Sequence, residues 1–203
     1  MPDTKRDILE AALNLFGRDG YEAVSVSAIA GKLGMTKGAL YKHYKSKRDI
    51  FDTIVAVMEK GDLDRARDYS MPEEKWEKGK EEYGKTSLEQ IAKYSKAQFR
   101  YWTEDEFPSL FRNMLTLEQY RDKEMQKLYQ QYLVSGPFEY VKDIFTELKI
   151  PNPEAAAGNF YGIMFLMYSV YDGAEDKEAV LSMLDRCIDE ETEKLKNEIN
   201  KNI

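Results

Sequence analysis

Residues 25–48 read "SVSAIAGKLGMTKGALYKHYKSKR", and this stretch decides the fold that we expect. Ser25 can cap a short helix, because its hydroxyl can accept a hydrogen bond from a backbone N–H of the first turn. Gly34 follows, where a positive φ angle is accessible without a Cβ. Thr36 can cap a second short helix that runs to about Tyr44. Helices this short are marginal alone, so the pair predicts a helix-turn-helix.

The second short helix has two contrasting sides. Leu40 and Tyr44 can pack inward, whereas Gly38 and Ala39 leave the outward side small enough to approach base edges in a major groove. Further side chains are then available to phosphates: Tyr41, Lys42, His43 and Lys47. This arrangement predicts a surface that lies against double-stranded DNA.

The charge distribution supports an anionic partner for the N-terminal segment only. The whole chain carries 37 acids against 30 Lys and Arg, a net charge of −7. Residues 31–48 nevertheless hold six basic residues and no acid, and residues 1–50 hold nine basic residues against six acids. A basic cluster alone is more often a solvated surface. Its coincidence with two capped short helices around a glycine favours nucleic acid.

The rest of the chain has helical periodicity almost throughout, which predicts an all-α fold. The first helix contains Ile8 to Phe16, and Gly20 is its expected end. A fourth helix, capped by Ser46, is expected from Lys47 to about Met58. The charged residues 61–85 are either a solvated helix end or a mobile connector.

Later helices are expected to begin at recognisable caps. Ser87 and Gln90 form a capping-box pattern that opens a helix to about Trp102. Asn152 can cap a helix that has Pro153 at its first position and runs to about Asp172. The last helix is expected from a cap at Asp176 to about Asn200.

Composition narrows the remaining possibilities. The longest apolar run, residues 160–171, is too short to span a bilayer, and the N-terminus lacks a secretory signal pattern. Cys187 is the only cysteine, which excludes an intrachain disulfide and a multi-cysteine zinc site. His43 is the only histidine, and no nucleophile–base pair is visible. We therefore expect a cytoplasmic protein that is not an enzyme and has no metal or cofactor.

Residues 8–51 resemble the N-terminal domain of TetR-type one-component transcriptional regulators. The resemblance rests on "LFGRDGYEAVSVSAIA", on the G-x-T-K-G-A-L-Y pattern and on "HYKSK". It implies a helix-turn-helix DNA-binding domain at residues 1–46 and a larger α-helical ligand-binding and dimerisation domain at residues 47–203. It further implies a homodimer that binds a palindromic operator and is released by a small-molecule inducer, as a repressor is.

The resemblance also assigns roles to single residues. It places Lys37, Gly38 and Ala39 near bases, Tyr41, His43 and Lys47 near phosphates, and Thr36 near either. Val26 departs from the family, many of whose members have a phosphate-binding Thr there. The equivalent contact would come from the Val26 backbone N–H, Ser25 or Ser27.

The larger domain offers candidates for two further surfaces. Aromatic and Met residues could line a cavity for an apolar or cationic aromatic ligand, although a core explains them equally well: Phe99, Trp102, Phe107, Phe111, Met114, Tyr120, Tyr132, Phe138, Tyr161, Phe165 and Tyr168. Two apolar helices could form an intersubunit four-helix bundle or belong to one protomer's core; the candidate dimer residues are Phe160, Met164, Met167, Tyr171, Val180, Leu184, Cys187, Ile188 and Leu195.

A second hypothesis is an α-helical protein-interaction module without an inducer. Its acidic C-terminal domain would dock a basic partner, and deletion of residues 1–46 would leave that activity intact. The sequence itself does not identify the operator or the inducer, and it does not distinguish a repressor from an activator.

Overall fold

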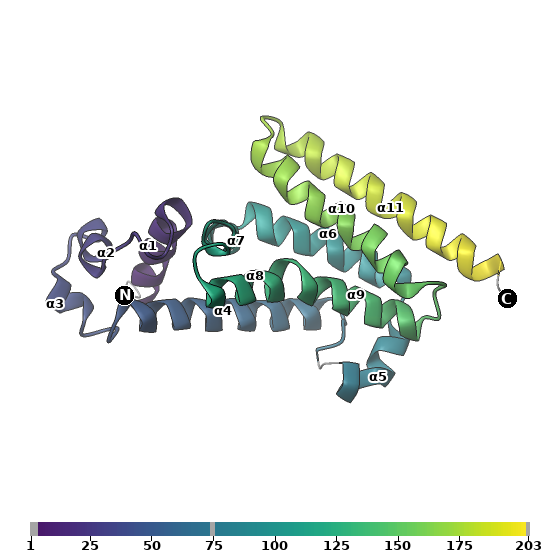
Figure 1. Ribbon diagram of the computed structural model, residues 1–203, viewed down its shortest axis with the longest axis horizontal. Coiled ribbons are helices and arrows are strands. Elements are labelled where there is room, and N and C mark those ends of the chain that lie inside the picture. Colours follow the sequence, from purple (N-terminus) through teal and green to yellow (C-terminus); the bar gives the residue numbers. More distant parts are fainter. Residues whose placement is uncertain (1–3, 74–75, 202–203) are drawn as a thin grey trace. The chain divides into compact units, whose positions relative to one another are not determined.

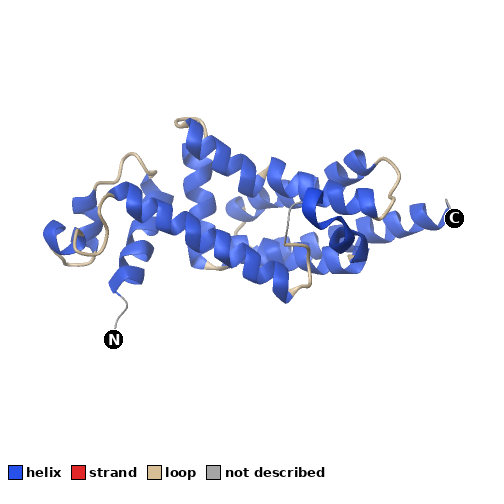
Figure 2. Ribbon diagram, turned by 90° about the horizontal axis from the view of Figure 1, so that it is seen from below, coloured by secondary structure: helices blue, strands red, loops and turns tan. Residues whose placement is uncertain are grey.

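The structure, a computed structural model, describes residues 4–73 and 76–201, and its regular elements in those ranges are all helices (Figures 1 and 2). This confirms the predicted all-α class. The chain divides into two compact units, unit 1 with residues 1–62 and 105–129 and unit 2 with residues 63–104 and 130–203. The functional division predicted after residue 46 remains a prediction.

Unit 1 combines the N-terminal helices with a later segment of the chain. Its elements are α1 (Thr4–Asp19), α2 (Val26–Lys32), α3 (Lys37–Leu40), the first part of α4 (Lys47–Asp68), α7 (Glu106–Glu118) and the start of α8 (Lys123–Leu133). α1 packs closely on α7 at Gly17. A Cβ added at this glycine would lie only 2.9 Å from the Leu110 carbonyl oxygen. Ile8 and Phe16 on α1 are fully buried, so the predicted apolar stripe is the core face.

Short-range hydrogen bonds set the helix ends in unit 1 much as predicted. Gly20 ends α1 with a φ of +86°, and its N–H bonds to the Phe16 carbonyl oxygen at 2.9 Å. The Ser46 hydroxyl caps α4 by accepting from the Asp49 N–H at 3.0 Å. These predictions are confirmed.

Two predicted helix lengths in this region were wrong. α3 ends at Leu40 rather than near residue 44, because the backbone tightens into a turn in which the His43 N–H bonds to the Leu40 oxygen at 2.9 Å. α4 runs to Asp68, ten residues beyond Met58. The charged stretch stays helical because Arg65 bonds to Gln98 at 2.7 Å and to the Ala97 oxygen at 2.8 Å, within unit 2.

Unit 2 is built from long helices that lie side by side. Besides the ends of α4 and α8 it contains α5 (Trp76–Lys85), α6 (Leu88–Glu104), α9 (Ser135–Glu147), α10 (Pro153–Gly173) and α11 (Lys177–Lys201). α10 lies between α9 and α11, and α6 packs against both α10 and α11 (Figure 1). Within the described ranges, no helix combines the length and the apolar character that a membrane crossing requires.

The predicted caps of unit 2 are confirmed in two cases and corrected in one. Ser87 and Gln90 form both bonds of the capping box, at 2.9 and 3.1 Å. Asp176 caps α11 through the Ala179 N–H at 3.0 Å. Asn152 makes no side-chain cap, because it adopts a left-handed φ of +49° instead of the extended backbone from which a cap side chain reaches the first turn.

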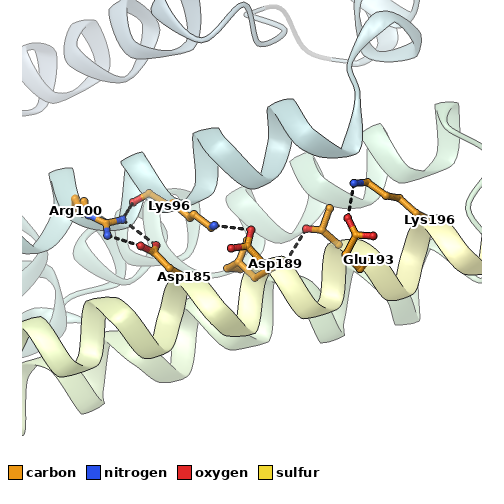
Figure 3. Close-up of polar contacts among 8 residues, drawn as sticks. Lys96, Arg100, Asp185, Asp189, Glu193 and Lys196 are labelled. Carbon is orange, nitrogen blue, oxygen red and sulfur yellow. Dashed lines mark hydrogen bonds and ion pairs between the residues drawn. The ribbon is translucent and has the colours of Figure 1, made fainter.

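Ion pairs fasten α6 to α11 along their length (Figure 3). Arg100 forms two hydrogen bonds to Asp185, at 3.0 and 2.7 Å. Lys96 contacts Asp189 at 2.5 Å. Lys196 contacts Glu89 at 2.9 Å. These contacts set the register of the two helices.

Candidate nucleic-acid interface

The turn between α2 and α3 is defined by side-chain caps on both sides. The Ser25 hydroxyl accepts from the Ala28 N–H at 3.1 Å, and the Thr36 hydroxyl accepts from the Ala39 N–H at 3.2 Å. Gly34 has a φ of +64° between them. The Met35 N–H then bonds back to the Ala30 oxygen at 3.0 Å. Local sequence therefore produces the sharp turn of a helix-turn-helix.

α3 presents a small, open surface to solvent. Leu40 and Tyr44 anchor it, with exposures of 0% and 5%. Gly38 points away from this core, since the nearest atom to an added Cβ is the Thr36 hydroxyl oxygen at 4.0 Å. Ala39 is half-buried beside it. In the described part of the chain, no other helix comes within 4 Å of that Cβ position, which suits the groove-facing prediction.

The remaining predicted DNA-binding residues surround this opening. Ser25, Ser27, Thr36, Lys37 and Lys42 are exposed, Tyr41 is 44% exposed, and His43 and Lys47 are half-buried. The Lys37 ammonium lies 5.7 Å from the centre of the Tyr41 ring. Among the described residues, Lys37 and Lys42 make no ion pair. Their charges are available to an anion, and their contact with DNA remains a prediction.

Lys47 has an internal role that the sequence did not indicate. Its ammonium donates to the Tyr21 carbonyl oxygen at 2.9 Å and lies 4.2 Å from the centre of the Tyr21 ring. That ring packs between Phe16 and Phe51, with both centroid distances 5.1 Å, and burial raises the pKa of Tyr21. Lys47 thus joins the start of α4 to the segment that leads into α2. An ammonium has three donors, so a phosphate contact stays compatible with this bond.

Arg48, the next residue, is neutralised within unit 1. It donates to Asp52 at 2.6 Å and to both carboxylate oxygens of Glu124 at 2.6 and 2.5 Å. The hydrogen bonds to Glu124 and Asp52 raise the pKa of Arg48. The spacing of four residues could have indicated Asp52, but no sequence signal identifies Glu124. Arg48 is therefore a structural cation rather than a free one.

The predicted ligand-lining residues are divided between the two units. Phe107, Phe111, Met114 and Tyr120 belong to unit 1 and the others to unit 2. Tyr120 is 87% and Phe165 43% exposed, so these two lie on the surface rather than around an enclosed space. Phe107 and Phe138 are half-buried, and the rest are buried.

The buried members in unit 2 pack on one another as a core does. Phe99 stacks on Tyr168 at 4.8 Å, and Trp102 lies 5.9 Å from Tyr132. The Tyr161 hydroxyl donates to the Leu133 oxygen at 2.7 Å. The surface depression that extends from Arg67 to Lys85 has none of these residues in its lining. A ligand cavity lined by the aromatic residues remains a prediction.

The predicted dimer residues lie on α10 and α11. Most of them are buried within the protomer, with exposures of 0–6%: Phe160, Met164, Met167, Val180, Leu184, Ile188 and Leu195. Tyr171 and Cys187 are half-buried. The apolar stripes of α10 and α11 face the core of their own protomer, and a part for these residues in a dimer remains a prediction. What α10 leaves exposed is a different face that includes Gly158, Gly162 and Leu166.

Within residues 4–73 and 76–201, no group of three or more His, Cys, Asp or Glu side chains could hold a metal ion. The expected absence of a metal and a cofactor stays a prediction.

Comparisons with known proteins agree with this geometry. The sequence model described as "Bacterial regulatory proteins, tetR family" matches residues 8–54. The chain is 40% identical over 57 residues to the HTH-type transcriptional regulator AcrR of Shigella flexneri, which is 28% of this chain and 26% of that protein. It is 32% identical over 68 residues to the Tetracycline repressor protein class D of Escherichia coli, which is 34% of this chain and 29% of that protein. The chain thus spans under a third of the length of these relatives.

The solved structures extend the likeness to the whole fold. The crystal structure of a TetR-family transcriptional regulator from Bordetella parapertussis superposes with a TM-score of 0.63. The superposition covers 93% of this chain and 95% of the Bordetella chain, and the two sequences are 18% identical. At this identity the likeness establishes the fold alone.

Proposed function

We propose that this chain, a member of the tetR family of bacterial regulatory proteins through residues 8–54, is a ligand-responsive repressor. It binds a palindromic operator as a homodimer, and a small apolar or aromatic ligand releases it. The observation that carries the proposal is the open face of α3, where a Cβ at Gly38 would meet nothing closer than the Thr36 hydroxyl oxygen at 4.0 Å. Lys37 and Lys42 beside it are exposed and make no ion pair among the described residues.

The two parts of this face have different tasks. Gly38 and Ala39 leave room for base edges, and Lys37 can donate to the acceptor atoms of guanine in the major groove. Lys42, Tyr41 and His43 are suited to phosphates, which position the protein without reading sequence. The hydroxyls of Ser25, Ser27 and Thr36 are further donors at the same surface.

A homodimer supplies the two-fold symmetry that a palindromic operator requires. The exposed face of α10 supports this assembly, since Leu166 is 59% and Phe165 43% exposed there. Gly158 and Gly162 on the same face have no side chains, so a partner helix can approach closely. Contiguous exposed apolar surface of this kind marks interaction sites.

Regulation would act on the separation of the two α3 helices. Two recognition helices must reach major grooves one helical turn apart, about 34 Å, or a multiple of it. α4 carries Lys47 at its start and ends in unit 2 at Asp68. A ligand that tilts α4 would move α3 out of register and lower operator affinity.

Electrophoretic retardation with the DNA upstream of the chain's own gene tests the proposal. The wild-type chain should retard this DNA and protect a palindromic footprint. Gly38→Leu should abolish the footprint while the unfolding midpoint stays unchanged, because Gly38 is exposed and a Cβ there comes no closer than 4.0 Å to the Thr36 hydroxyl oxygen. Gly38→Ala is the matched control. It adds only a methyl group and should weaken operator binding less than Gly38→Leu does.

Two outcomes would overturn the proposal. A Gly38→Leu variant that keeps the same footprint would show that this face does not enter the groove. The second outcome combines two results: the chain retards no duplex at low ionic strength, and it still binds a protein partner after deletion of residues 1–46. This outcome would favour the protein-interaction module.

A further inference from the structure

The first turn of α1 lies beside the residues that follow α3. The Tyr44 hydroxyl donates to the backbone oxygen of Lys5 at 3.2 Å, across 39 residues of sequence. Tyr44 itself is 5% exposed, so it is a fixed part of unit 1 and not a mobile side chain. Lys5 is thereby held next to the residues that follow α3.

The charge of Lys5 is uncompensated. Lys5 is exposed, and among the described residues it makes no ion pair. Its neighbour Arg6 is instead paired with Glu10 at 2.9 Å. Asp7, two residues after Lys5, is half-buried. A free ammonium therefore stands on this side of unit 1.

Two other lysines lie close to Tyr44 in sequence. Lys42 is two residues before it and Lys45 directly after it, and both are exposed without an ion pair in the described part of the chain. Lysines gathered in this way repel one another in the free protein. A polyanion relieves that repulsion and releases its own counterions.

We propose that Lys5 is a further phosphate contact of the DNA-binding surface, and that Tyr44 is a positioning residue that holds it there. The contact extends the surface beyond the helix-turn-helix to the first turn of α1. This inference rests on the proposed DNA-binding function. It assigns Lys5 no part in reading bases, so its effect is the same for every sequence.

The test compares full-length variants on a random-sequence duplex of about 30 base pairs, roughly three helical turns. Affinity is measured between about 50 and 200 mM salt. Lys5→Ala should reduce the slope of log affinity against log salt by about 0.9 for each bound subunit. The ratio of wild-type affinity to Lys5→Ala affinity should therefore fall about threefold per subunit as the salt rises across this range. The unfolding midpoint should stay unchanged.

Lys60→Ala is the matched control. Lys60 is an exposed lysine of the same unit, and it lies 13 residues after Lys47 on α4, about 20 Å along the helix. Its loss should leave the slope unchanged. Acetylation of lysines in the complex gives an independent readout, in which the duplex should protect Lys5 and leave Lys60 reactive.

Tyr44→Phe tests the positioning role, because it removes only the hydroxyl. The variant should reduce the slope in the wild-type background and have no further effect in the Lys5→Ala background. Equal slopes for Lys5→Ala and Lys60→Ala would overturn the Lys5 contact. An equal effect of Tyr44→Phe in both backgrounds would overturn the positioning role. A wild-type chain that binds no duplex would overturn the proposed function as well.

Discussion

Arg48 and Glu124 form a two-point ion pair across 76 residues of sequence, with N–O distances of 2.6 and 2.5 Å. The pair fastens the start of α4 to the start of α8, and the Arg48 guanidinium holds the pKa of Glu124 below its usual value. Both side chains are about half exposed. Such exposed pairs add little to the free energy of unfolding, and salt screens them. This pair nevertheless holds Arg48 in place, directly after Lys47.

Glu124→Gln should lower the unfolding midpoint slightly at low ionic strength. The amide cannot replace a carboxylate that accepts from two guanidinium nitrogens. Calorimetry at low salt and at about 1 M salt, where charges are screened within about 3 Å, should find the difference only at low salt. Glu59→Gln, at an exposed acid in the interior of α4 and in the same unit, is the control. A difference that persists at high salt would contradict an ionic origin.

Gly20→Ala should destabilise the chain more than Gly34→Ala does. Both glycines have positive φ angles, +86° and +64°, and a left-handed residue with a Cβ costs about 1–2 kcal/mol. Only at Gly20 would the new Cβ meet another atom, the fully buried Glu118 carboxylate at 2.2 Å. Urea unfolding should therefore give a loss of about 3 kcal/mol or more for Gly20→Ala. Equal losses would contradict the clash.

Lys47→Ala should affect both stability and DNA binding. Loss of the bond to the Tyr21 oxygen and of the contact with its ring should cost about 1 kcal/mol in urea unfolding. Loss of a phosphate contact should reduce the salt slope of binding by about 0.9 per subunit, for all sequences alike. Lys47→Arg keeps the charge and should keep most of the slope. An unchanged slope for Lys47→Ala would leave Lys47 with only its internal role.

The contribution of the Glu89–Lys196 pair should depend on pH. The hydrogen bond from Lys196 lowers the pKa of Glu89 to about 2, and the bonds to Glu193 and Glu89 raise the pKa of Lys196 to about 12. The stabilisation by Glu89 is therefore complete above pH 4.5, its ordinary pKa, and is lost as the pH falls toward 2. That of Lys196 is complete below pH 10.5 and is lost as the pH rises through 12.

The corresponding measurement compares the wild type with Glu89→Gln. The unfolding midpoint of the wild type should be higher near neutral pH, and the gap should narrow as the solution is acidified below pH 4.5. A gap that is constant down to pH 3 would show that the carboxylate charge is not what matters.

Leu166→Glu should separate the proposed dimer without harm to the protomer fold. Leu166 is 59% exposed, so a charge there is solvated in the monomer but buried in an α10-mediated interface. Sedimentation equilibrium should show dimerisation weakened by about tenfold or more. Leu117→Glu on α7, where the residue is 41% exposed, should leave association unchanged. A Leu166→Glu variant that stays fully dimeric would exclude this face.

The sequence by itself determined the features that depend on neighbours a few residues apart. Ser25, Thr36 and Ser46 cap helices through N–H groups three residues ahead, and the predicted helix class and turn followed from them. The open, basic side of α3 was predicted for the same reason, because Leu40 and Tyr44 fix which way so short a helix faces.

Tertiary structure decided everything that depends on residues far apart in the chain. Lys47 meets Tyr21, Arg48 meets Glu124 and Tyr44 meets Lys5 only in the folded chain. The apolar residues of α10 and α11 were equally suited to a protomer core and to a dimer, since hydrophobic burial is not directional. Packing within the protomer buried most of them, and it left a different face of α10 in solvent.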